Sequence, residues 1–194
     1  MVLVFSRRLP ERTDKSNDVR FPNLPAALPM IESDVVRIQF GLLKPRAAEG
    51  TDKMESYSNY FLGNDPKKWR SRVPNFARAK LEEVYPGIDI VFYAKGREIE
   101  YDFIVKPGAD PGLISLHFDA PEKPTVDGVG NLTIRTRDGL LTHRAPVAFQ
   151  GEKILQASAR FDRGRLGFDL GPFDHALPVT IDPVLEYGTY LGGG

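Results

Sequence analysis

The chain has 194 residues, of which 26 are basic and 26 acidic, and it contains no cysteine. A neutral balance gives no net field to attract a polyanion, so neither nucleic acid nor an anionic membrane is expected as the main partner. The lack of cysteine excludes disulfides, thiolate catalysis and cysteine-based zinc sites. No apolar run in the sequence is long enough to cross a bilayer, so no membrane insertion is expected.

Residues 1–33 show no sustained hydrophobic period and contain four prolines. Proline disfavours helix interiors and central strands, so this segment is expected to be an extended arm. The arm would pack on the body or, in a homodimer, on a second copy. The first residues, MVLVFSRRLPER, place apolar residues before arginines, the reverse of a secretory signal. This order indicates a mature or truncated chain, or one that is not exported.

Alternation of apolar and polar residues, the period of a half-buried strand, recurs along the rest of the chain. Segment 75–84 also has the composition of a helix, but a strand is expected because its neighbours are strands. The predicted strands cover residues 34–40, 56–62, 75–84, 88–94, 97–106, 113–118, 131–136, 140–144, 147–150, 154–161, 165–170 and 178–187.

Polar and glycine-rich segments separate these strands. A polar loop is expected over 44–53, and Gly63-Asn64-Asp65-Pro66 predicts a turn in which Pro66 opens a short helical turn ending near Trp69. About a dozen short strands with such turns predict an all-β fold, an antiparallel β-sandwich or open barrel over residues 34–187 with an extended N-terminal arm.

The clearest hairpin joins 88–94 to 97–106 through Lys95-Gly96. Its apolar face is expected to lie on a core, and its acidic face is expected to be wet. That acidic face can bind Ca²⁺, which prefers several carboxylate oxygens, or can raise one pKa and supply a general acid. The alternative is a solvated face with Arg or Lys partners. The acidic face consists of Asp89, Glu98, Glu100 and Asp102.

A second calcium hypothesis rests on loop residues that place oxygens around glycines. Asp127 and Asn131 flank Gly128 and Gly130, but the loop lacks the alternating acids and terminal Glu of an EF-hand. The alternative is ordinary hairpin-turn chemistry.

The chain has three histidines, His117, His143 and His175, without HExxH spacing. Imidazole can ligate zinc or act as a base, and His175 beside Asp174 could join a serine such as Ser56, Ser58 or Ser158 in a hydrolase triad. No GxSxG sequence supports this, and ordinary surface histidines are the alternative.

Aromatic residues gather between positions 57 and 93. Buried, they would form core; exposed, they would stack on sugars or bind a partner surface. Trp69 follows a polar turn and is expected to be exposed, and Tyr60 and Tyr93 are the other ligand-binding candidates. The group comprises Tyr57, Tyr60, Phe61, Trp69, Tyr85 and Tyr93.

Four blocks, NYFLGNDPKKW, VYPGIDIVFY, EYDFIVKPGADP and VTIDPVLEYGTYLGGG, occur in this order. In them the chain resembles the N-terminal domain that precedes the repeats of bacterial SBBP (β-propeller-repeat) proteins. The resemblance implies an extracellular or cell-surface setting, an all-β fold and no established catalytic residues. It also implies that residues 188–194 are a linker or the start of a truncated propeller repeat.

The function expected from these observations is a non-catalytic extracellular interaction or structural module that binds a protein or carbohydrate surface. The alternative is a small metal-assisted hydrolase of an ester, lactone or glycoside, with Ca²⁺ as its cofactor and Asp102, Glu100 and His175 as catalytic candidates.

Overall fold

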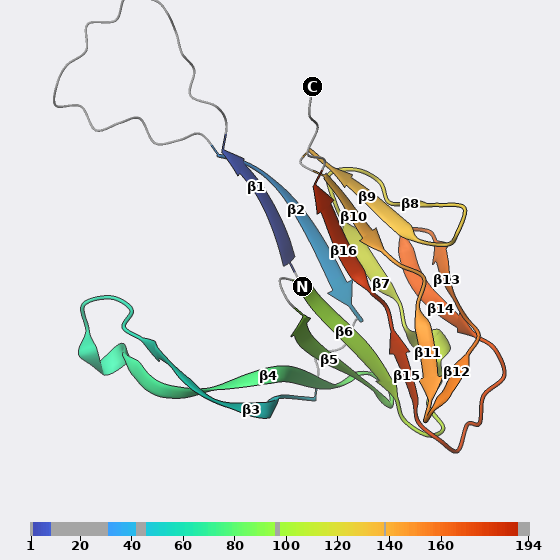
Figure 1. Ribbon diagram of the computed structural model, residues 1–194, viewed down its shortest axis with the longest axis horizontal. Coiled ribbons are helices and arrows are strands. Elements are labelled where there is room, and N and C mark those ends of the chain that lie inside the picture. Colours follow the sequence, from blue (N-terminus) through green and yellow to red (C-terminus); the bar gives the residue numbers. More distant parts are fainter. Residues whose placement is uncertain (1, 9–30, 42–45, 96–97, 138, 190–194) are drawn as a thin grey trace, which may run out of the picture.

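A computed structural model describes residues 2–8, 31–41, 46–95, 98–137 and 139–189, and most of these residues lie in antiparallel strands (Figure 1). The predicted all-β antiparallel fold is confirmed. Two short 3₁₀ turns are the helical elements of this part of the chain, η1 (Pro66–Lys68) and η2 (Pro111–Leu113).

The strands form three sheets. The first has the order β1-β2-β7-β14-β13 and contains β1 (Val2–Arg8), β2 (Ile31–Phe40), β7 (Leu116–Asp119), β14 (Arg165–Leu170) and β13 (Ala157–Asp162). The second has the order β12-β11-β15-β6-β5-β4-β3 and contains β12 (Lys153–Leu155), β11 (Val147–Gln150), β15 (Val179–Asp182), β6 (Glu98–Val105), β5 (Ile88–Lys95), β4 (Arg70–Tyr85) and β3 (Ala47–Tyr60). The third has the order β16-β10-β9-β8 and contains β16 (Leu185–Thr189), β10 (Gly139–His143), β9 (Leu132–Thr136) and β8 (Thr125–Val126).

The core lies where the inner faces of these sheets meet. Phe103 of β6 contacts Phe168 of β14 with ring centroids 5.8 Å apart, which joins the second sheet to the first. His143 of β10 stacks on Phe168 at 6.1 Å and brings in the third sheet. The layers therefore face each other as in a β-sandwich, with apolar side chains from all three sheets removed from water.

The first residues of the predicted extended arm form an edge strand. Val2–Arg8 forms β1, which pairs with β2 so that Val2 lies opposite Arg37. The run Val2-Leu3-Val4-Phe5 is rich in β-forming residues, and it covers an edge of the first sheet that would otherwise be unpaired. The sequence does not predict this strand, because the prolines that follow indicate an irregular segment. Residues 9–30 of the predicted arm, and residues 190–194 of the predicted linker, lie outside the described residues.

The structure differs most from the predicted strands and loops in the following places. The polar loop predicted over 44–53 is wrong from Ala47 onward, because β3 pairs along its length with β4 without burying an apolar face. The strand predicted over 154–161 is two strands, β12 and β13, which belong to different sheets. The strand predicted over 178–187 likewise divides into β15 and β16 around Pro183.

The turn between β4 and β5 requires glycine at position 87. Gly87 has φ +70°, and a Cβ there would lie 2.8 Å from Cβ of Ala109. We expect Gly87→Ala to lower the free energy of unfolding by about 1–2 kcal/mol, because it combines left-handed strain with a steric contact. Urea denaturation measures the loss. Gly108→Ala is the control, since Gly108 has φ +77° and no atom of the described residues lies within 4 Å of the added carbon. Equal losses would contradict the role given to Ala109.

Candidate functional site

The most distinctive feature of the molecule is the β3–β4 hairpin, which leaves the body as a two-stranded ribbon (Figure 1). Along β3, Thr51 and Ser58 are half-buried and the other residues are exposed. A ribbon of this kind gains little from apolar burial, so its stability depends on backbone pairing and on its attachment to the sandwich.

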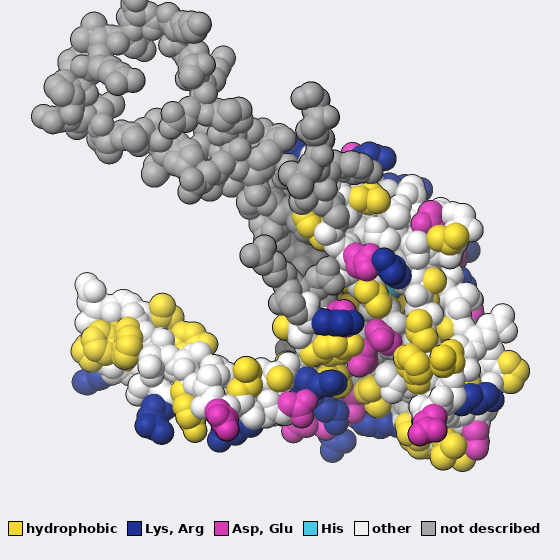
Figure 2. All heavy atoms as spheres, viewed as in Figure 1, with side chains coloured by type: hydrophobic (Ala, Val, Ile, Leu, Met, Phe, Trp, Pro, Cys, Tyr) yellow, Lys and Arg dark blue, Asp and Glu magenta, His cyan; other side chains and the backbone are white. Residues whose placement is uncertain are grey.

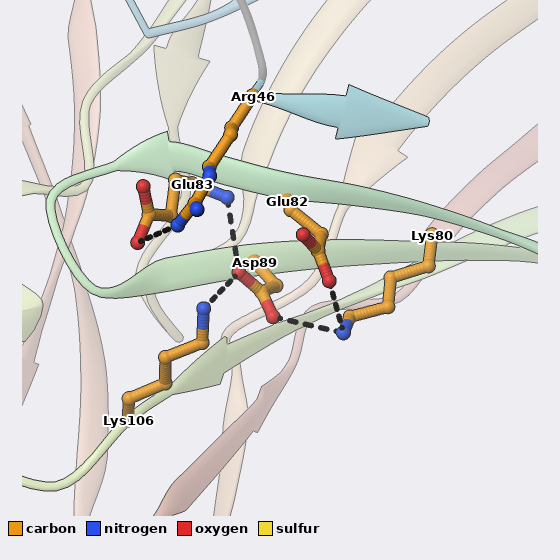
Figure 3. A network of polar contacts seen from close by, with 6 residues as sticks. All are labelled: Arg46, Lys80, Glu82, Glu83, Asp89 and Lys106. Atoms are coloured by element: carbon orange, nitrogen blue, oxygen red, sulfur yellow. Dashed lines mark hydrogen bonds and ion pairs between the residues drawn. The ribbon is translucent and has the colours of Figure 1, made fainter. Parts of the chain in front are cut away.

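The attachment, here called the hairpin root, is a polar network of Arg46, Lys80, Glu82, Glu83, Asp89 and Lys106 (Figure 3). β4 carries a register shift between Leu81 and Tyr85, and Glu83 has φ +52°. A bulge of this type bends a strand and redirects the residues after it. The Oδ1 atom of Asp89 accepts the backbone N–H of Glu83 at 3.0 Å, so this buried carboxylate holds the bend in place.

Asp89 is 1% exposed, yet it remains ionised because two ammonium groups reach it. Lys106 Nζ lies 2.8 Å from Oδ1, and Lys80 Nζ lies 3.2 Å from Oδ2. Burial alone would raise the pKa of Asp89, but the hydrogen bonds from Lys106, the Glu83 backbone and Lys80 outweigh it and lower the pKa. Arg46 adds a backbone bond to the Glu82 carbonyl at 2.8 Å and an ion pair with Glu83 at 3.8 Å.

The far end of the ribbon, residues 60–72, is called the hairpin tip. As predicted, Pro66 opens a helical turn after Gly63, whose φ is +71°, and Trp69 follows that turn. Asp65 caps the turn by accepting the Lys67 backbone N–H at 3.0 Å. Trp69 Nε1 donates to the Gly63 carbonyl at 3.1 Å, so the loop is ordered by its own bonds.

Exposed apolar side chains concentrate on this ribbon. Of the thirteen large exposed hydrophobic residues in the described part of the chain, seven lie between positions 54 and 76 (Figure 2). At the tip, Phe61 is 61% exposed, Leu62 71% and Trp69 40%, and the Phe61 and Trp69 rings meet edge to face at 5.3 Å. The seven residues are Met54, Tyr57, Tyr60, Phe61, Leu62, Trp69 and Phe76.

Sequence reasoning selected Trp69 and Tyr60 as ligand-binding candidates, and both are exposed on the tip. Tyr93 lies elsewhere, half-buried on β5 beside an open groove of about 580 Å³ at the base of the ribbon. Its hydroxyl donates to Asp102 Oδ1 at 3.0 Å, and the Arg78 guanidinium lies 4.9 Å from its ring centroid. Tyr93 therefore belongs to the sheet surface at the base of the ribbon.

The expectation that the acidic hairpin face is wet is wrong for two of its members. Asp89 and Glu100 are 1% and 3% exposed, because long basic side chains from neighbouring positions cover them. Lys95 Nζ lies 3.4 Å from Glu100 Oε1, while Asp89 is held in the root. Asp102 is half-buried, and the side chain of Glu98 lies outside the described residues.

Asp182, the last residue of β15, completes this acidic group. Ile181 of β15 pairs with Phe103 of β6, so Asp182 lies level with Asp102. Burial raises the pKa of Asp102 against the Tyr93 hydrogen bond, and the charges of Asp182 and Glu100 raise it further. Burial and the charge of Glu100 likewise raise the pKa of Asp182, whose buried Oδ1 atom has no hydrogen-bond partner in the described part of the chain.

We expect Asp182→Asn to raise the free energy of unfolding at pH 7 by about 1 kcal/mol, because the neutral amide removes a negative charge that burial and Glu100 disfavour. Because the folded-state pKa of Asp182 is raised, the penalty exists above the unfolded value of 3.8 and disappears when the carboxylate is protonated. The gain should therefore vanish in urea titrations below that pH. A gain that is the same at every pH would contradict the electrostatic cause.

The calcium candidates are not brought together. Among the described residues, no group of three or more His, Asp or Glu side chains is placed to hold a metal ion. Asp127 Oδ1 accepts the backbone N–H groups of Val129 and Asn131, both at 2.9 Å, and Oδ2 accepts Asn131 Nδ2 at 2.9 Å. These bonds are those of a side-chain-capped turn.

The histidines have separate local roles. His117 Nδ1 lies 3.2 Å from the Gly164 carbonyl, and His143 is buried against Tyr101. His175 is exposed and its ring packs on Phe173 at 4.3 Å. Ser58 donates to Asn75 at 2.8 Å, so its hydroxyl is occupied within the β3–β4 ribbon.

The fold and the exposed hairpin define an all-β domain whose most accessible apolar surface is a projecting ribbon. A family model described as a domain of unknown function (DUF7948) matches residues 3–184, and the chain belongs to this family. A search of curated proteins finds no match, and a search of solved structures finds none either. Within the described residues, no helix is long and apolar enough to span a membrane.

Proposed function

We propose that the chain is a non-catalytic binding module that contacts its partner through the hairpin tip. The observation that carries this proposal is the concentration of exposed aromatic and aliphatic side chains on a ribbon that projects from a packed sandwich. Exposed apolar patches of this kind mark interaction surfaces. The tip is also ordered by internal hydrogen bonds, so little conformational entropy is lost when a partner binds.

An extracellular or cell-surface setting, and a position ahead of propeller repeats, are part of the proposal. They are supported by the resemblance of the four sequence blocks to SBBP-repeat proteins. Of these blocks, NYFLGNDPKKW forms the end of β3, the tip and its 3₁₀ turn. One of the four blocks that carry the resemblance therefore also carries the exposed surface.

The proposal is tested by binding of the fluorescently labelled chain to the cell-envelope fraction of the organism that makes it. We expect saturable binding that is lost in Phe61→Ser/Trp69→Ser. The matched control is Ile154→Ser/Leu177→Ser, which removes two apolar residues of the body that are at least as exposed as the tip pair. Retention of binding by the tip variant, or equal loss in the control, would remove the tip from the proposal.

The hydrolase alternative has one observation in its favour, the neighbouring carboxylates Asp102 and Asp182 with raised pKa values. Paired carboxyl groups of this kind can share a proton and act as a general acid. Turnover of ester, lactone or glycoside substrates that is lost in Asp102→Asn would favour the enzyme. A parallel assay with a chelator would show whether a metal takes part.

A further inference from the structure

The shape of the hairpin tip limits the kind of partner it can bind. Phe61, Leu62 and Trp69 lie at the outer end of the ribbon, whereas the open groove described above lies nearer its base, beside Phe76 and Tyr93. A small-molecule ligand needs a concave site that encloses it. A projecting apolar tip instead suits a partner surface into which it can insert.

The charge of the tip is strongly positive although the whole chain is neutral. Residues 60–72 contain four basic side chains, Lys67, Lys68, Arg70 and Arg72, and one acidic side chain, Asp65. The Asp65 carboxylate accepts a backbone N–H, and none of the four basic groups forms an ion pair with another described residue. Arg70 donates to the carbonyls of Lys67 and Trp69, and Arg72 lies over the Tyr57 ring at 5.2 Å.

Apolar and basic side chains are thus interleaved over one short loop. Aromatic rings favour the boundary between lipid headgroups and acyl chains, where an apolar body meets a wet edge. Lys and Arg next to them can extend to the phosphate layer while their aliphatic stems stay in contact with apolar groups. Basic residues near a bilayer are attracted to its anionic lipids over about one Debye length, roughly 8 Å at physiological salt.

We infer that the hairpin tip docks on an anionic phospholipid surface, with Phe61, Leu62 and Trp69 entering the headgroup layer and Lys67 and Lys68 contacting phosphates. This inference rests on the proposed function, because it names the partner class of the same tip. The docking is peripheral and does not require any segment to span the bilayer. Leu62, the most exposed of these residues, distinguishes a lipid partner from a nucleic acid, since an aliphatic side chain does not stack on bases.

The test is co-sedimentation of the full chain with phosphatidylcholine vesicles that contain or lack phosphatidylserine. We expect binding that requires phosphatidylserine, weakens with salt, and falls by at least about tenfold in Lys67→Glu/Lys68→Glu and in Phe61→Ser/Leu62→Ser. The matched control, Lys153→Glu/Ile154→Ser, makes the same types of change at exposed positions of β12 and should bind like the parent chain.

Four results would overturn the inference: no vesicle binding, equal binding to vesicles without phosphatidylserine, loss of binding in the β12 control, or tighter retention on single-stranded DNA than on vesicles. These outcomes are separable from failure of the proposed function. If the chain does not bind vesicles but the tip variants fail to bind the cell-envelope fraction, the lipid partner is wrong and the hairpin tip remains the binding surface. If the tip variants keep envelope binding, the proposed function itself is wrong.

Discussion

Acidification from pH 6.5 to pH 4 should lower the free energy of unfolding by about 3 kcal/mol through His143 alone. His143 is 1% exposed, and Tyr101 Oη lies 2.6 Å from its Nε2 atom. Burial lowers the pKa of His143 to about 4, against smaller opposing effects of the backbone of Arg144 and His143. The rings that contact its imidazole belong to Tyr101, Phe118 and Phe168, and none of these neighbours carries a carboxylate.

The sign is set by the number of protons that each state binds. Between pH 6.5 and pH 4 the unfolded chain protonates His143 and the folded chain does not, so stability is present above pH 6.5 and falls as the pH drops. In the neutral ring Nε2 shares a hydrogen bond with the Tyr101 hydroxyl, while the buried Nδ1 atom has no hydrogen-bond partner among the described residues.

Urea titrations at a series of pH values measure this loss. The control is Tyr101→Phe/His143→Leu, which removes both partners at once and leaves no orphaned polar group between them. Its stability should change much less over this pH range. A parent protein that is equally stable at pH 6.5 and pH 4, or a control with the same pH dependence, would exclude His143 as the cause.

Asp89→Ala should destabilise the protein by about 2–3 kcal/mol at pH 7 and loosen the hairpin root. The substitution leaves the ammonium groups of Lys80 and Lys106 and the Glu83 backbone N–H without their shared acceptor. The expected loss is below that of a fully buried ion pair, because the two lysine side chains are 28% and 40% exposed and water can solvate them.

Glu82→Ala is the matched control, since Glu82 contacts the same lysine at 3.1 Å but has an exposed fraction of 32%. Glu82→Ala should lower the free energy of unfolding by less than about 0.5 kcal/mol. Hydrogen exchange supplies the second measurement: the Glu83 amide should lose protection in Asp89→Ala and keep it in Glu82→Ala. Equal effects of the two substitutions would show that Asp89 does not hold the bend of β4.

The sequence predicts the elements whose side chains alternate across a buried face. β5 and β6 show this pattern, with Ile90 and Phe103 on the core side, and the Gly63–Pro66 turn follows from proline and glycine chemistry alone. It misses β3 over residues 47–53, because a ribbon exposed on both faces has no apolar period to read. It also misses the burial of Asp89 and Glu100, since the lysines that cover them come from other strands or turns.

The net charge of the chain is also a poor guide to the candidate surface, because it does not show where the fold places each charge. The chain has equal numbers of acidic and basic residues, which predicts no anionic partner, but the fold separates these charges in space. Acidic side chains gather on the sheet at Glu100, Asp102 and Asp182, whereas four of five charged residues at the hairpin tip are basic. The proposed lipid docking departs from the expectation based on net charge because it depends on this local separation.

Trp69 is the only tryptophan in the chain and lies on the hairpin tip, so its fluorescence reports directly on the proposed contact surface. In the free protein its emission should be that of a partly solvated indole and open to acrylamide quenching. When the cell-envelope fraction binds, we expect emission at shorter wavelength and reduced quenching. A protein that binds the envelope while the emission and quenching of Trp69 stay unchanged would contradict the hairpin tip as the binding surface.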